Sequence, residues 1–241
     1  MSRPIQRRVA LLAQLLFGMI VARHMDRERY SWRRLVGWTS RFASGFFSLL
    51  QIHEEIESLL IEVERLEPLN ILEIGTAGGG TLFLLSRAAT RDSVLISVDL
   101  PKGAWGGGYS WWRGSIYKQL LRPGQRCRLI RGDSHSASSL DGVKAALGGR
   151  SLDVLFIDGD HSYAGVRQDF NMYAPLVRRD GLIAFHDIVV HPPSTKTEVS
   201  QFWNELKGSY EHKEFIKDPA QGWAGIGVLF NNPRDGVDRS T

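Results

Sequence analysis

ILEIGTAGGGTL, residues 71–82, is the stretch that decides the fold, because an apolar run passes directly into a glycine-rich turn. Ile71–Ile74 predicts a buried strand, and Thr81 begins a helical pattern. Glycines let the backbone turn sharply and approach a ligand closely, and the following helix points its N-terminus at that ligand. Position 77 is alanine, so the turn lacks the dinucleotide-binding pattern G-x-G-x-x-G. The stretch therefore predicts a strand, a turn and a helix with a ligand at the turn.

Strand-like runs and helical stretches alternate along the rest of the chain. The predicted strands are Ile71–Ile74, Val94–Asp99, Arg128–Arg131, Asp153–Asp158, Leu182–Asp187, Tyr210–Phe215 and Ile226–Phe230. The predicted helices that follow the first strand lie near Thr81–Ala89, Ser115–Leu121, Leu140–Leu147, Tyr163–Val177 and Glu198–Lys207. This alternation predicts an α/β fold, with a mostly parallel sheet and helices on both faces. The last two strands follow each other without a helix, which predicts that one of them runs antiparallel.

Residues 1–66 are predicted to form an N-terminal helical extension, residues 67–232 the ligand-binding domain, and residues 233–241 a flexible tail. Leucine pairs four residues apart make Val9–Ala22 a helical stripe, and Leu49–Leu66 is a second helix that Pro68 ends. Because three arginines precede the first stripe, three interpretations of it stay open. It is a helix packed on the domain or on a sister subunit, a helix on an anionic membrane surface, or a signal peptide.

Charge and cysteine content argue against several classes of protein. Residues 1–41 hold nine arginines against Asp26 and Glu28, a local charge of +7 that leaves −3 for the remainder, since the total is +4. The basic character thus belongs to the N-terminus, which argues against a nucleic-acid-binding core. The single cysteine, Cys127, excludes an internal disulfide and favours a reducing, cytoplasmic location. No apolar run is long enough to predict a membrane span.

An acidic residue lies at or beside the end of each of the first five predicted strands: Glu73, Asp99, Asp133, Asp158 and Asp187. Ligands of open α/β sheets bind outside these carboxyl ends. Asp99 is suited to the two hydroxyls of a ribose, and Asp133, which Ser134 follows, is suited to an adenine amino group. The glycine turn contains no lysine or arginine. An adenosyl ligand with a cationic sulfonium therefore fits this rim better than a pyrophosphate does.

Five motifs resemble those of class I S-adenosylmethionine-dependent methyltransferases: ILEIGTAGGGTL (71–82), ISVDLP (96–101), LIRGDSHS (129–136), LDVLFIDGDHSYAGVRQDF (152–170) and GLIAFHDI (181–188). More narrowly, residues 65–232 are similar to the branch of macrocin-type sugar O-methyltransferases and cephalosporin hydroxylase-like proteins. The resemblance implies a Rossmann-like, seven-stranded sheet and S-adenosylmethionine as methyl donor. The cofactor-binding residues that it implies are Glu73, Gly75, Thr76, Gly79, Asp99, Asp133, Ser134 and Asp158.

The resemblance also implies the residues that carry the reaction. His161 in the IDGDHSY motif is expected to be the general base for an acceptor hydroxyl, with Asp158 as a second catalytic residue. Relatives bind a divalent metal at positions that match Asp158, His186 and Asp187, although a carboxylate is common where His186 stands. Three outcomes therefore stay open: a two-carboxylate Mg²⁺ site, a mixed site for a metal such as Mn²⁺, or no metal.

Lys102–Gly114, KGAWGGGYSWWRG, combines five glycines with Trp105, Trp111 and Trp112. It is either a mobile lid whose rings bind an acceptor, or a loop whose rings pack on the domain. The leading hypothesis is O-methylation of a hydroxyl on a sugar or other glycosylated small molecule. The similar proteins imply a homo-oligomer, for which the N-terminal helices are candidate contacts. Two other hypotheses stay open: an oxidoreductase, and a non-catalytic adenosyl-binding protein.

Overall fold

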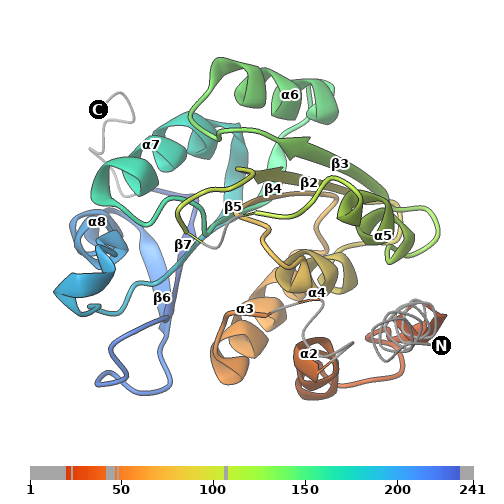
Figure 1. The fold of residues 1–241 in the computed structure, drawn as a ribbon, viewed down its shortest axis with the longest axis horizontal. Helices are drawn as coiled ribbons and strands as arrows, with labels where there is room; N and C mark the ends of the chain where they lie inside the picture. The colour runs from red at the N-terminus through yellow and green to blue at the C-terminus, as the bar shows by residue number, and fades with distance from the viewer. Residues whose placement is uncertain (1–19, 23, 42–46, 48, 106–107, 234–241) are drawn as a thin grey trace, which may run out of the picture.

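The computed structural model describes residues 20–22, 24–41, 47, 49–105 and 108–233, which form a seven-stranded sheet between two layers of helices (Figure 1). The strands are β1 (Asn70–Ile74), β2 (Val94–Asp99), β3 (Arg126–Arg131), β4 (Leu152–Ile157), β5 (Val177–His186), β6 (Glu211–Phe215) and β7 (Ile226–Phe230). Their order across the sheet is β3-β2-β1-β4-β5-β7-β6. β1 to β5 are parallel, and β7 runs antiparallel to both of its neighbours. The direction of chain progress reverses between β1 and β4, where ligands of such sheets bind.

Helices cover both faces of the sheet. They are α2 (Trp32–Arg41), α3 (His53–Arg65), α4 (Gly80–Ala88), α5 (Arg113–Gln119), α6 (Ala137–Leu147), α7 (Tyr163–Tyr173) and α8 (Val199–Leu206). α2 to α5 lie on one face and α6 to α8 on the other (Figure 1). Successive side chains of a strand point to opposite faces, so Ile71 packs with the first layer and Leu72 with the second. Every residue of β1 and β2 is buried, as expected for central strands with helices on both sides.

The predicted Rossmann-like α/β fold is confirmed, with all seven predicted strands, and β7 is the antiparallel one. One predicted helix, Tyr163–Val177, is too long. α7 ends at Tyr173 because Pro175 cannot continue the helical hydrogen bonds, and a 3₁₀ turn occupies Ala174–Leu176. Helix α2 was not predicted from the sequence. Its buried apolar residues are few and are interrupted by arginines, so the helical pattern is weak in the sequence.

Residues 20–41 are joined to the domain around a buried arginine. Arg87 of α4 donates hydrogen bonds to the backbone carbonyl oxygens of Ala22, Met25 and Leu120. Burial lowers the pKa of Arg87 to about 9. This part of the predicted extension therefore packs on the sheet's helical layer. Most of the predicted helix Val9–Ala22 lies outside the described residues, as does all but the first residue of the predicted tail.

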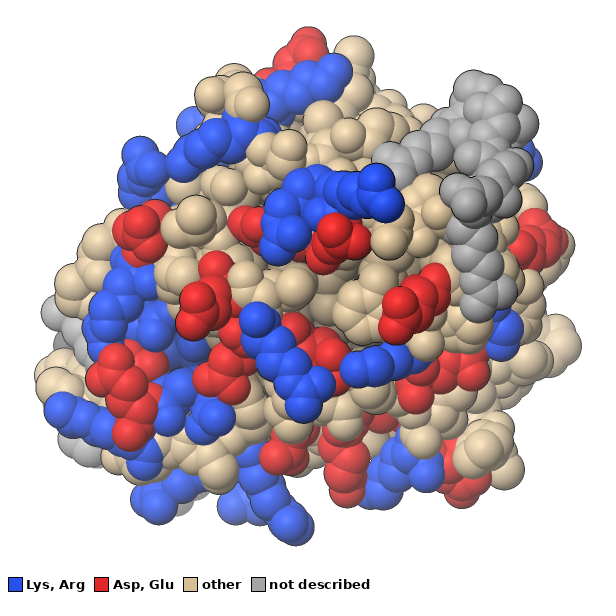
Figure 2. Space-filling model, turned by 180° about the vertical axis from the view of Figure 1, so that it is seen from behind, with Lys and Arg blue, Asp and Glu red and all other residues tan. Residues whose placement is uncertain are grey.

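The surface carries mixed charge. Figure 2 shows basic and acidic side chains interspersed over the face opposite to the view of Figure 1. This pattern differs from the continuous basic stripe that binding to a phosphate backbone favours. Within the described residues, no helix is both long and apolar enough to cross a bilayer.

Candidate functional site

Gly75 brings the glycine turn into direct contact with the end of β4. Its φ of +87° is a left-handed conformation, and a Cβ atom at this position would lie 1.8 Å from the carbonyl oxygen of Asp158. No side chain fits there, so the sequence places glycine where two strand ends meet. Ala77 also has a positive φ, +42°. The turn therefore adopts its left-handed conformation at Ala77 in spite of the alanine side chain.

Asp99 ties the glycine turn to the loop that follows β2. Its Oδ1 accepts hydrogen bonds from the backbone N–H groups of Thr76 (3.0 Å) and Ala77 (3.1 Å). Its Oδ2 accepts a hydrogen bond from the backbone N–H of Tyr109 at 2.9 Å. The carboxylate is therefore fixed beside the turn by three backbone donors.

Glu73 is a fully buried acid of β1. Its side chain is 0% exposed, and neither of its carboxylate oxygens has a hydrogen-bond partner among the described residues. Burial raises the pKa of Glu73 well above its usual range, and the negative charges of Asp158 and Asp99 raise it further. Buried polar atoms without partners are rare in folded proteins, and a ligand or a water molecule usually satisfies them.

A cavity of about 210 Å³ opens between the glycine turn and the loop after β2. Its lining includes four of the predicted cofactor residues, Gly75, Asp99, Asp133 and Ser134. Asp133 accepts a hydrogen bond from the backbone N–H of His135 at 2.9 Å. Gly79 instead shapes the start of α4, where a Cβ atom would lie 2.8 Å from the ring of Tyr117. The cavity thus unites the predicted ribose and adenine positions at the carboxyl edge of the sheet.

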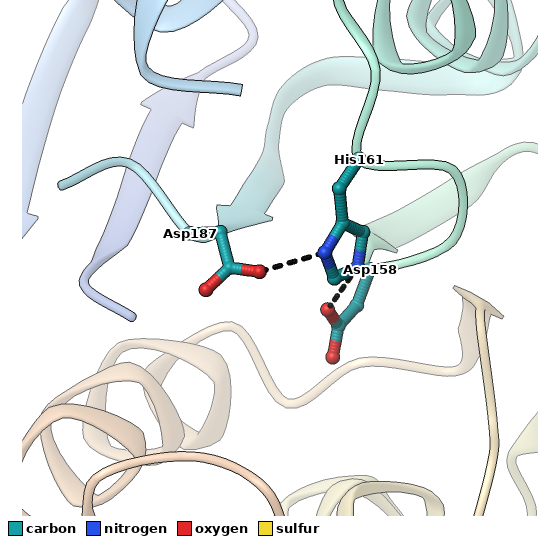
Figure 3. A group of neighbouring side chains, drawn as sticks. All are labelled: Asp158, His161 and Asp187. Carbon is teal, nitrogen blue, oxygen red and sulfur yellow. Dashed lines mark ion pairs between the residues drawn. The ribbon is translucent and has the colours of Figure 1, made fainter. Parts of the chain in front are cut away.

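His161 lies between two carboxylates that follow β4 and β5 (Figure 3). Its Nδ1 is 2.9 Å from Oδ2 of Asp187, and its Nε2 is 3.4 Å from Oδ1 of Asp158. Each of the three residues offers a ligand atom within 4.8 Å of the others. Burial disfavours the charged imidazole, but the two carboxylates outweigh burial and raise the pKa of His161 to about 10. In this arrangement His161 is therefore an imidazolium at neutral pH.

His186, the last residue of β5, lies against the same two carboxylates and is 5% exposed. Its Nδ1 is 3.1 Å from Oδ1 of Asp158 and 3.3 Å from Oδ1 of Asp187. Asp187 has a left-handed φ of +64°, and its Oδ1 also accepts a hydrogen bond from the backbone N–H of Ala224 and lies 3.2 Å from Nε2 of His191. The structure therefore brings all three predicted metal residues together, on a backbone whose strain is typical of functional sites.

A residue ahead of α3 also enters the site. Gln51 donates a hydrogen bond from Nε2 to Oδ2 of Asp158 at 2.8 Å, and its Oε1 accepts one from the Thr81 hydroxyl at 2.9 Å. The Thr81 donor fixes which end of the amide faces Asp158. Sequence reasoning missed Gln51, because it lies 107 residues from Asp158 and belongs to no local motif.

The predicted lid contributes one tryptophan to the site. Trp105 stacks on the imidazole of His161, with ring centroids 5.0 Å apart and planes inclined by 15°. Trp111 and Trp112 are 76% and 43% exposed. The loop therefore combines both interpretations of its tryptophans, one packed at the reacting centre and two open to solvent.

Residues 72–188 match the family model of a methyltransferase domain. The match runs from β1 to the turn after β5, so it contains the glycine turn and all five acidic strand ends. Within these residues, the fold and the site are similar to those of class I, S-adenosylmethionine-dependent methyltransferase domains.

Solved structures share this fold at low sequence identity. An O-methyltransferase from Bacillus cereus, solved in complex with SAH, is 16% identical with a TM-score of 0.58, and the likeness covers 84% of this chain and 91% of that one. A second structure is MycE, a methyltransferase of the mycinamycin biosynthetic pathway solved with Mg, SAH and mycinamycin VI. It is 18% identical with a TM-score of 0.54, and the likeness covers 85% of this chain and 56% of that one.

The curated relatives found by sequence match this chain over only part of their length. The uncharacterized protein y4gI of Sinorhizobium fredii is 29% identical over 175 residues, which are 70% of this chain. The chain spans 18% of the length of that protein and 62% of the length of a second curated relative.

Proposed function

We propose that the protein transfers the methyl group of S-adenosylmethionine to a hydroxyl of a sugar or glycosylated small molecule. The observation that carries this proposal is the position of His161, held between Asp158 and Asp187 beside an acidic cavity at the carboxyl edge of a methyltransferase domain. A base next to a cofactor cavity is the arrangement that transfer to a hydroxyl requires.

The cofactor would bind by charge and by hydrogen bonds along the acidic rim. Asp99 would accept hydrogen bonds from the ribose hydroxyls, because each carboxylate oxygen can accept more than one hydrogen bond in addition to those from the turn. Asp133 would accept from the adenine amino group, and the unpartnered oxygens of Glu73 would accept from the ammonium group of the methionine part. Negative charge around the cavity favours the cationic sulfonium over its neutral product.

The chemistry is an in-line displacement. The acceptor oxygen forms a bond to the methyl carbon while the carbon–sulfur bond breaks, and the sulfur leaves as the neutral thioether of S-adenosylhomocysteine. The hydroxyl proton passes to His161 in its neutral form, whose protonated Nδ1 is held by Asp187 at 2.9 Å. His161 reaches that form when positive charge bound beside it offsets the two carboxylates, which raise its pKa. Nε2 makes the longer contact, 3.4 Å to Asp158, and is therefore assigned the proton transfer.

The residues present fit a divalent cation. Nδ1 of buried His186, which has no hydrogen-bond partner among the described residues, and the neighbouring Oδ1 atoms of Asp158 and Asp187 form a compact donor set, which would hold the metal. A cation held there would bind the acceptor oxygen, stabilise its alkoxide and lower the pKa of the adjacent His161 toward that of a base.

The acceptor class is proposed from the aromatic loop. Trp105 lies flat on His161, and Trp111 and Trp112 expose apolar ring surface from the same loop. Flat aromatic rings suit the apolar faces of sugar rings, while the polar centre suits their hydroxyls. MycE, whose fold is similar, was solved with the glycosylated compound mycinamycin VI.

The test is methyl transfer from labelled S-adenosylmethionine to matched acceptors: glycosides, their aglycones, and deoxy analogues that lack single hydroxyls. We expect label in an ether on the sugar of the glycosides, and loss of product when the acceptor hydroxyl is removed. Equal labelling of glycoside and aglycone would contradict the acceptor class. Turnover of NAD without any methyl transfer would support an oxidoreductase instead.

A further inference from the structure

His186 presents one atom to two carboxylates. Its Nδ1 lies 3.1 Å from Oδ1 of Asp158 and 3.3 Å from Oδ1 of Asp187. The two carboxylates come from the ends of β4 and β5, which are neighbouring strands of the sheet. Three donor atoms from adjacent strand ends therefore converge on one region of space.

These contacts are close enough for ion pairs with a protonated ring, but they lack hydrogen-bond geometry. Neither ring nitrogen of His186 has a hydrogen-bond partner among the described residues, although the side chain is 95% buried. Leaving buried polar atoms without partners is costly, so such atoms indicate a ligand. The unsatisfied Nδ1 faces the carboxylates, so the ligand expected between them is a cation.

His161 is arranged differently. It uses Nδ1 for Asp187 and Nε2 for Asp158, so its ring bridges the carboxylates with two different atoms (Figure 3). One nitrogen of His161 is near enough to both carboxylates to join a metal shell, but an ion bound there would break one of these two contacts, whereas the single Nδ1 of His186 faces both carboxylates. His161 is therefore suited to proton transfer, and His186 is the histidine suited to coordination.

The separations agree with a coordination shell. Ligands bound at about 2.1 Å lie about 3.0 Å apart at neighbouring octahedral positions and about 3.4 Å apart in a tetrahedron. The contacts of His186 at 3.1 and 3.3 Å fall within this range. An imidazole in the shell changes which metal is preferred, because Mg²⁺ favours oxygen ligands while Mn²⁺, Fe²⁺, Co²⁺ and Zn²⁺ accept nitrogen.

We propose that Asp158, His186 and Asp187 form a mixed nitrogen and oxygen site that binds a divalent transition-metal ion such as Mn²⁺ in preference to Mg²⁺. The inference rests on the proposed function in sharing Asp158 and Asp187 with the reacting centre. Its test does not require turnover, because metal binding and cofactor binding are measured separately.

The test uses the full chain freed of metal and titrated with Mn²⁺, with free Mn²⁺ followed by electron paramagnetic resonance and Mg²⁺ as competitor. Electron spin-echo modulation then reports whether a nitrogen is bound to the Mn²⁺. We expect nitrogen coupling in the wild type and in His161→Gln, and its loss in His186→Asp. We also expect His186→Asp to move the Mn²⁺-to-Mg²⁺ preference toward Mg²⁺ by about tenfold or more.

Absence of nitrogen coupling in the wild type would overturn the proposal, as would loss of the coupling in His161→Gln with retention in His186→Asp. An unchanged Mn²⁺-to-Mg²⁺ preference in His186→Asp would also overturn it. His186→Asn is the second variant if the additional buried carboxylate prevents folding, and its nitrogen coupling should likewise be lost. Titration with S-adenosylhomocysteine separates this result from the proposed function: failure to bind it would reject the methyltransferase chemistry and leave the metal preference standing.

Discussion

The two halves of the acidic edge are built in different ways. In the cofactor half, Asp99 is held by backbone N–H groups of the glycine turn and of the following loop, which come from neighbouring motifs. In the reacting half, Asp158 is contacted by the side chains of Gln51, His161 and His186, which come from three separate segments. One half is thus a property of a local chain conformation, and the other is a property of the tertiary fold.

This difference predicts which substitutions affect cofactor binding and which affect turnover. A backbone-lined half depends on glycine conformation and on one carboxylate, so it should bind the cofactor whatever happens at the histidines. A side-chain-lined half depends on charge balance among four groups, so single substitutions there should affect turnover and metal more than cofactor affinity. The two halves should therefore respond to separate sets of variants.

The largest effect is expected for His161→Ala. Removing the base should lower kcat by about 10²- to 10⁴-fold. The affinity for S-adenosylhomocysteine should change little, because His161 lies outside the backbone-lined half. The measurement is single-turnover methyl transfer alongside calorimetric titration, with His212→Gln on β6 as the control histidine. A variant that keeps wild-type turnover would remove His161 from the chemistry.

The next largest effect is on folding. Gly75→Ala places a Cβ atom against the carbonyl oxygen of Asp158 in a left-handed conformation, which should lower the free energy of unfolding by about 3 kcal/mol. Gly148→Ala is the matched control, since its φ is +57° but nothing lies within 4 Å of an added Cβ. The control should cost only about 1 kcal/mol in urea denaturation. Equal losses in the two variants would show that the contact at Gly75 is not tight.

Asp99→Asn reverses the pattern expected for His161→Ala. The neutral amide is a weaker acceptor and has one donor end, so affinity for S-adenosylhomocysteine should fall by about 10- to 100-fold. With cofactor at saturating concentration, kcat should be largely recovered. A lower kcat at saturation would contradict the separation of the two halves.

Gln51→Glu tests whether Asp158 is oriented from the N-terminal side. A second carboxylate in place of the amide removes the donor at 2.8 Å and adds like charge, so kcat should fall by about tenfold. Thr81→Ser keeps the hydroxyl that fixes the amide and should retain activity. If Gln51→Glu and the wild type share the same pH profile and kcat, Gln51 only fills space.

The smallest effect expected is a pH dependence of stability at His135. Buried Asp169, whose Oδ1 lies 3.3 Å from Nε2 of His135, raises the pKa of His135, and the charge of Asp133 adds to this. A raised folded-state pKa contributes stability below the unfolded pKa of about 6.5, and this contribution is lost as pH rises through the folded-state value. His135→Gln should therefore cost more unfolding free energy at pH 6 than at pH 9. A cost independent of pH would show that the pair carries no net charge interaction.

The same contrast explains how much could be predicted from the sequence. Local patterns predict the strands and the glycine turn, because apolar runs alternate with helical stretches along the chain. They also predict that Gly75 lies near Asp99, because both lie at the carboxyl ends of parallel strands, which meet at one edge of the sheet. The pairing of His161 with Asp187 and the entry of Gln51 depend on how distant segments pack, for which one sequence carries no periodic signal. His161 was expected to be a general base, yet two carboxylates raise its pKa to about 10, since their distances are set by tertiary structure.

Isothermal titration of the full chain with S-adenosylhomocysteine, and separately with NAD, tests the central claim most directly. The account predicts saturable binding of S-adenosylhomocysteine with one site per chain, weakened in Asp99→Asn and preserved in His161→Ala, and no binding of NAD. Binding of NAD alone, or binding of S-adenosylhomocysteine that is insensitive to Asp99→Asn, would contradict it.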